Sequence, residues 1–91
     1  MATGADGESL LQFPCDYPLK VMGAAGGTLK ARAFEIVSRH VPDLDRSRVE
    51  TRASRKGRYV AYTFRFTATS RRQLDDLYAE LGQCQDVRAA L

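Results

Sequence analysis

Side chains that could do catalytic chemistry are few in this chain, and they stand apart. It has one histidine, His40, and two cysteines, Cys15 and Cys84. His40 has no serine, cysteine or carboxylate positioned as a catalytic partner, and it falls in the last turn of a predicted helix, where we expect it to cap or pack. The cysteines match no metal-ligand spacing, so we expect free thiols. We therefore predict no catalytic residue, no metal and no cofactor, and a protein that is not an enzyme.

Two other stretches have the residue types that bind anions. A glycine-containing loop at 23–27 precedes Thr28 at the predicted start of a helix, where free backbone N–H groups favour negative charge. A basic turn at 54–58 could strengthen such a site. The glycine spacing matches neither a Rossmann fingerprint nor a P-loop, and a purely structural interpretation, in which the glycines turn the chain and the cations are solvated, stays open. The candidate ligand-binding residues are Gly23, Gly26, Gly27, Thr28, Lys56 and Arg58.

The basic turn leads into a strand whose two faces differ in composition. Because side chains alternate along a strand, one face is apolar and the other is mixed. The apolar face has Val60, Tyr62, Phe64, Phe66 and Ala68, and the mixed face has Tyr59, Ala61, Thr63, Arg65 and Thr67. The sheet must therefore bury one face against other elements.

Three more segments have the pattern of strands. Residues 17–24 alternate weakly, residues 47–53 place apolar side chains on one face, and residues 87–91 give a short closing strand. The turn at 54–57 joins the second and third strands into a hairpin, with Gly57 supplying a permissive backbone.

Two amphipathic helices lie between the strands. The first follows Thr28, which we expect to cap it by accepting backbone hydrogen bonds, and it ends at Pro42. The second begins with a capping box made by Ser70 and Gln73, and Gly82 is its predicted stop. Each helix has one apolar stripe, and each stripe must cover part of the sheet.

The order strand, helix, strand, strand, helix, strand predicts an α+β fold of the ferredoxin-like βαββαβ type. Right-handed crossovers give a four-stranded antiparallel sheet of order 4-1-3-2 with both helices on one face. Residues 1–8 are predicted to be a flexible tail, and residues 9–91 a single domain. This topology brings the 23–27 loop, the basic turn and the segment 82–85 to one rim.

Composition narrows the class of partner only slightly. The chain has 91 residues, 44% of them hydrophobic, and a formal charge of +3, which is a mild excess that does not demand an acidic partner. No apolar run is long enough to span a bilayer, and the start lacks the blocks of a signal peptide. A cytoplasmic protein without a membrane role is therefore expected.

Several segments resemble the YbeD family of small bacterial cytoplasmic proteins. The most specific are Lys-Val-Met-Gly at 20–23 and Ser-Arg-Lys-Gly-Arg-Tyr at 54–59, and the resemblance covers nearly everything after the tail. It implies a ferredoxin-like fold similar to ACT regulatory domains, which bind small effectors beside the loop after the first strand and commonly at a pairing interface. The corresponding loop here is 23–27. A genomic association also links the family to lipoate metabolism.

Two functions of different kinds follow. The first is a non-catalytic regulatory or interaction module that senses a small metabolite or docks a metabolic enzyme. The alternative is binding of RNA or another nucleic acid through the Arg-rich hairpin, because RNA-recognition motifs share this topology. Base stacking is disfavoured because it needs aromatic rings on the open face of the sheet. The alternation along the strand places Tyr62, Phe64 and Phe66 under the helices and leaves only Tyr59 of this strand on the open face. An acylphosphatase is disfavoured because the chain has no asparagine.

The mixed sheet face is a third surface to consider. It could take a partner protein, or an edge strand could pair with another copy to make a homodimer. Its residues are Lys20, Met22, Tyr59, Thr63 and Arg65.

Overall fold

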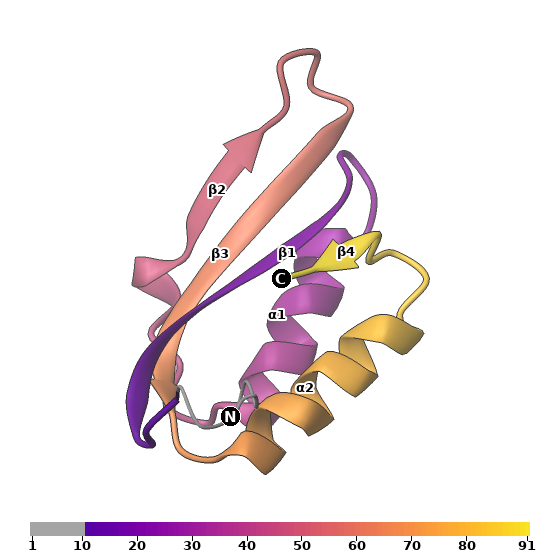
Figure 1. Ribbon diagram of the computed structural model, residues 1–91. Coiled ribbons are helices and arrows are strands. Elements are labelled where there is room, and N and C mark those ends of the chain that lie inside the picture. Colours follow the sequence, from indigo (N-terminus) through magenta and orange to yellow (C-terminus); the bar gives the residue numbers. More distant parts are fainter. Residues whose placement is uncertain (1–10) are drawn as a thin grey trace, which may run out of the picture.

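The sheet has four antiparallel strands in the order β2-β3-β1-β4, which is the predicted order read from the other edge (Figure 1). The computed structural model describes residues 11–91, so the predicted tail lies outside the described residues. The strands are β1 (Cys15–Ala24), β2 (Glu50–Ala53), β3 (Tyr59–Ala68) and β4 (Ala89–Ala90). The two long strands, β1 and β3, pair over their whole length and form the centre of the sheet.

Two helices, α1 (Leu29–His40) and α2 (Arg71–Gln83), cover one face of this sheet, so the predicted α+β ferredoxin-like fold is confirmed (Figure 1). Several predicted boundaries were wrong by a few residues. The first strand starts at Cys15, and the second starts only at Glu50, because Arg46–Arg48 form a short 3-10 helix, η2. The closing strand shortens to two residues.

Gly82 does not stop the second helix, contrary to the prediction. The helix runs through Gly82 to Gln83, and the chain leaves it at Cys84 with extended backbone. The Cys84 N–H donates to the Leu81 carbonyl at 3.1 Å, which tightens the last turn. A left-handed glycine is therefore not needed at this helix end.

The two predicted N-terminal caps differ. At α2, the Gln73 N–H donates to Ser70 Oγ at 3.1 Å, and the Gln73 side chain accepts from the Thr69 N–H at 2.8 Å, so a capping box is confirmed with its return bond shifted by one residue. At α1, Thr28 occupies the cap position but accepts no cap bond. Its hydroxyl is directed elsewhere, and the predicted capping role of Thr28 is wrong.

The core lies between the helices and the apolar face of the sheet, as strand parity predicted. Phe64 is fully buried, Tyr62 and Phe66 are nearly so, and the ring of Phe34 on α1 meets Phe64 edge-on at 5.2 Å between centroids. Tyr59, which has the opposite parity, is 46% exposed on the other face. The remaining hydrophobic residues of the core are Leu19, Val21, Leu29, Ala33, Ile36, Val37, Val41, Val60, Ala68, Leu74, Leu77 and Leu81.

His40 joins the ends of the two helices, in agreement with a packing role. Its Nε2 lies 2.8 Å from Glu80 Oε1, so His40 does have a carboxylate partner, which the sequence did not predict. Its carbonyl accepts from the Gln73 side-chain amide at 2.9 Å. Arg39 also pairs with Glu80. These contacts hold the end of α1 against α2, far along the helix from the glycine loop.

Candidate functional site

The glycine loop has a packing role at its first residue. A Cβ on Gly23 would stand 2.3 Å from the Asp86 carbonyl oxygen and 2.9 Å from Leu29 Cδ2, so only glycine lets β1, α1 and the segment before β4 approach this closely. Gly26 has a φ of +83°, which favours glycine in the turn, whereas a Cβ on Gly27 would meet nothing within 4 Å. Close packing at Gly23 and the positive φ at Gly26 therefore explain why these two positions are glycine, without a bound ligand.

The N-terminus of α1 faces a carboxylate from the protein itself. The Thr28 hydroxyl donates to Asp86 Oδ2 at 2.5 Å. A small hollow of about 310 Å³ opens beside this contact, lined by the glycine loop together with Asp86 and Arg88. The position expected for a bound anion therefore already carries negative charge, which is favourable at a helix N-terminus.

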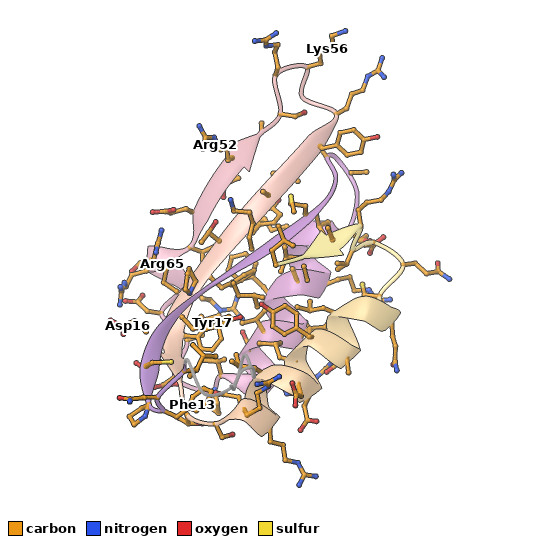
Figure 2. All side chains as sticks on the ribbon, in the orientation of Figure 1. Phe13, Asp16, Tyr17, Arg52, Lys56 and Arg65 are labelled. Carbon is orange, nitrogen blue, oxygen red and sulfur yellow. The ribbon has the colours of Figure 1, made fainter. Side chains whose placement is uncertain are left out.

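The structure separates the two basic candidates. The Arg58 carbonyl accepts from the Ala25 N–H at 2.8 Å, so the backbone of Arg58 lies beside the loop. Lys56 is at the tip of the hairpin, well beyond the loop (Figure 2). Gly26, Gly27 and Thr28 line the hollow together with Gln85, Asp86 and Arg88, whereas Gly23 packs against Leu29 and the Asp86 backbone and does not line it. The rim segment predicted from the sequence ended at residue 85, three residues short of Arg88.

A second hollow, of about 420 Å³, lies on the open face of the sheet. Pairing aligns Met22, Ala61 and Arg52 side by side across three strands, and Ala24 pairs with Tyr59 next to them. We call this the open-face hollow. It is lined by Lys20, Met22, Arg52, Ala53, Ser54, Arg55, Tyr59, Val60 and Ala61.

The open-face hollow combines an apolar floor with a cationic border. Met22, Ala61 and the Tyr59 ring make the floor, whereas the charged groups that line it are all basic. The Arg88 guanidinium carbon lies 5.6 Å from the Tyr59 ring centroid and adds a cation–π contact. Tyr59 and Leu91 are the large hydrophobic side chains exposed within residues 11–91, and the backbone of Leu91 is hydrogen-bonded to Lys20 beside this hollow.

The groove between α1 and α2 has a different character. It encloses about 640 Å³, and Arg39 on its wall is already paired with Glu35 and Glu80. Cys84 also lines it, and both cysteines are free thiols, as predicted. Within the described part of the chain, no cluster of His, Cys, Asp and Glu side chains could hold a metal ion. Neither helix in that part is long and apolar enough to cross a membrane.

Two solved structures similar to this chain are small α+β proteins. Protein HP0495 from H. pylori matches with a TM-score of 0.65 and 11% identity, covering 100% of this chain and 96% of that one. The uncharacterized protein TM1266 from Thermotoga maritima matches with a TM-score of 0.62 and 16% identity, covering 84% of this chain and 92% of that one. At these identities the likeness shows the fold alone.

Sequence relatives are much closer. A UPF0250 protein of Nitrosomonas europaea is 43% identical over 74 residues, which is 81% of this chain and 85% of the relative. One from Janthinobacterium is 39% identical over 84 residues, covering 92% of each. The profile of the family described as "Protein of unknown function (DUF493)" matches residues 8–91. The resemblance to the YbeD family is thereby confirmed, and the chain belongs to the DUF493 family, whose members include these UPF0250 proteins.

Proposed function

We propose that this protein is a non-catalytic interaction module that docks an acidic segment of a partner protein, such as a metabolic enzyme, on the open-face hollow. The observation that carries the proposal is the apolar floor of Met22, Ala61 and Tyr59 bordered by Lys20 and Arg52 without a carboxylate among its lining residues. Exposed aromatic side chains beside cations are typical of the centre of protein interfaces.

Docking of a protein fits this chain better than sensing of a small anionic effector at the glycine loop. The Asp86 carboxylate bonded to Thr28 would repel an amino-acid carboxylate or a phosphate that approached the α1 N-terminus. The Arg88 side chain, which could otherwise offset that charge, lies over the Tyr59 ring. The effector version requires both groups to rearrange, whereas the open-face hollow needs no rearrangement.

Binding of a nucleic acid is the second candidate, favoured by the hairpin cations. Within residues 11–91, Arg52, Arg55, Lys56 and Arg58 form no ion pair with a carboxylate. Base stacking, however, uses several aromatic rings on one platform, and β1 and β3 offer only Tyr59 on the open face. Phosphate contact without base readout is the form that the geometry permits.

A titration followed by amide chemical shifts separates these three cases. The probes are a short Glu-rich peptide with one leucine, a short oligothymidine, and a mixture of free amino acids and carboxylates. We expect the peptide to shift the amides of Met22, Tyr59 and Ala61 and to leave the glycine loop unchanged. Tyr59→Ala should weaken peptide binding about tenfold, because an exposed aromatic anchor is lost.

Arg72→Glu on α2 is the matched control for charge, because this side chain is highly exposed and lies on the other side of the molecule. It should leave peptide binding unchanged. Shifts confined to residues 23–28 in the amino-acid mixture would replace docking by effector sensing. Binding of oligothymidine alone, weakening steeply as salt rises, would favour the nucleic-acid candidate.

A further inference from the structure

The outer edge of β2 is open in the described part of the chain. The sheet order places β2 at one end, and β3 is its only partner among residues 11–91. All four of its residues are exposed, and the helices do not reach over it (Figure 1). An exposed edge strand presents unpaired N–H and C=O groups that can pair with another strand.

The register with β3 fixes which backbone groups point outward. The Ser54 N–H donates to the Tyr59 carbonyl at 2.9 Å, so Ser54 faces β3. In an antiparallel ladder this direction alternates, and Arg52 and Glu50 therefore also face β3. The backbone groups of Thr51 and Ala53, and by the same alternation Val49, point away from the sheet.

We propose that β2 pairs antiparallel with β2 of a second copy of this chain, about a two-fold axis that passes beside Thr51. The N–H and C=O groups that point away from one sheet must bond to the corresponding groups of the second copy. The two-fold axis of a symmetric β2 pair can therefore pass only beside residue 50, 51 or 52. These three registers share the same backbone hydrogen-bonding direction. They differ in the side chains that they place opposite one another.

Charge selects one of the three registers. Centring on Glu50 sets the two Glu50 side chains against each other, and centring on Arg52 does the same for two arginines. Centring on Thr51 places Glu50 opposite Arg52 of the second copy, twice by symmetry, and sets Thr51 against itself. Opposite charges and threonine pairs across neighbouring strands are stabilising, whereas like charges directly opposite are destabilising.

The existing ion pairs leave this arrangement available. Arg52 has no carboxylate partner among the described ion pairs, and its side chain extends from β2 in Figure 2. Glu50 lies 3.4 Å from Arg65, with 65% of its side chain exposed. A carboxylate can accept from two arginines, so Glu50 can keep Arg65 and receive Arg52 of the second copy.

The surface above β2 is also free to lie near a second copy. Thr51 and Ala53 are on the side of the sheet that bears the helices, yet both are exposed. Beside them, a groove of about 710 Å³ runs along the flank of α1 past the half-buried ring of Phe34. In the proposed dimer, the two sheets would join into one of eight strands, with both α1 flanks on the same side of the joined sheet.

Sedimentation equilibrium over about 10 µM to 1 mM tests the pairing, because a short edge interface is expected to be weak. We expect the wild type to dimerise with a dissociation constant of roughly 10–500 µM. Thr51→Pro should abolish the dimer and leave the fold intact by circular dichroism, because the proline removes an outward N–H and no bond to β3.

The register is tested by a charge swap. Arg52→Glu should raise the dissociation constant about tenfold, because it sets a new carboxylate against Glu50 of the second copy, twice by symmetry. Combining it with Glu50→Arg restores opposite charges across the axis but removes the Glu50–Arg65 ion pair, so the dissociation constant should return only to within about threefold of the wild type. Arg72→Glu, which makes the same charge change on α2, should leave dimerisation unchanged.

Three results would overturn the proposal: a wild type that stays monomeric at about 1 mM, a dimer that survives Thr51→Pro, or a double swap no better than Arg52→Glu alone. Arg52 belongs both to the proposed dimer edge and to the border of the open-face hollow, so the two proposals are separated with variants at other residues. Tyr59→Ala should leave the dimer unchanged, and Thr51→Pro should retain peptide binding, so failure of one proposal does not carry over to the other.

Discussion

The two faces of the sheet use the same strands and have opposite properties. On the face beneath the helices, neighbouring residues of β1 and β3 such as Leu19 and Phe64 pair with no exposed surface. At the adjacent pair of the ladder, Lys20 pairs with Thr63 on a face that keeps cations and Tyr59 in solvent. Core packing and the proposed docking surface therefore use alternate residues of the same strands, so each can be changed separately.

The largest expected effect comes from deleting a ring on the covered face. Phe64→Ala should destabilise the protein by about 3–5 kcal/mol, since it removes a fully buried side chain that packs against Phe34. Tyr59→Ala, five residues earlier on the open face, should change stability by less than about 0.5 kcal/mol. Urea unfolding followed by circular dichroism measures both. Equal losses for the two variants would contradict the separation of the faces.

The next largest loss of stability is expected at Gly23, where backbone segments approach closely on the covered side of the sheet. Gly23→Ala should cost about 1–3 kcal/mol, because its Cβ would meet the Asp86 carbonyl oxygen, which belongs to the backbone and cannot swing away. Gly27→Ala is the matched control in the same loop, with open space around it, and should be neutral or stabilising by up to about 1 kcal/mol. Both are measured by the same urea unfolding.

A Gly27→Ala loss as large as that of Gly23→Ala would contradict this account of the loop. It would mean that conformational freedom, rather than space, is what the loop requires. The Gly23 result also bears on function. If Gly23→Ala unfolds the rim while peptide binding at the open-face hollow persists, the two regions act independently.

Strand parity is why so much of the fold could be predicted from the sequence. The alternation at 59–68 assigned each residue of β3 to its face, and the two helical stripes then had one sheet face to cover. Element ends were predicted less well because they depend on local hydrogen bonds. Gly82 stays helical because Cys84 tightens the last turn, and Asp45 accepts from the Ser47 N–H at 3.0 Å and starts a 3-10 turn where a strand was predicted.

The candidate site was predicted less completely than the fold. The topology brought residues 23–28 to one rim, as expected, but it could not show that Asp86 would bond to Thr28 across a separation of 58 residues. The distance of Lys56 from the loop likewise depends on how far the hairpin extends (Figure 2). Contacts between side chains from separate loops depend on exact loop paths, which no periodicity in the sequence encodes.

The N-terminal caps of the two helices contribute less to stability than the core ring or Gly23. Ser70→Ala should cost about 1 kcal/mol, because Ser70 accepts from the Gln73 N–H at the start of the helix that covers the sheet. Thr28→Ala at the other helix start removes a bond to Asp86 and no cap bond, so it should cost less. Thermal unfolding of both variants measures the difference. A greater loss for Thr28→Ala would show that the Asp86 contact stabilises the fold more than a cap does.

An effect of similar size concerns the polar pair on the covered side of the sheet, where the hydroxyls of Tyr17 and Tyr78 lie 2.9 Å apart. Burial, and then the hydrogen bond to Tyr17, raise the pKa of Tyr78 above its ordinary value. The unfolded chain therefore loses this proton first, from about pH 10 upward, and the contribution of Tyr78 to stability is present below that pH and is lost as the pH rises further. Tyr78→Phe should cost about 1 kcal/mol near pH 7. The loss of stability in Tyr78→Phe relative to the wild type should shrink above about pH 10, as measured by urea unfolding at several pH values. A loss that stayed constant up to about pH 11 would show that the pKa of Tyr78 is not raised in the folded protein.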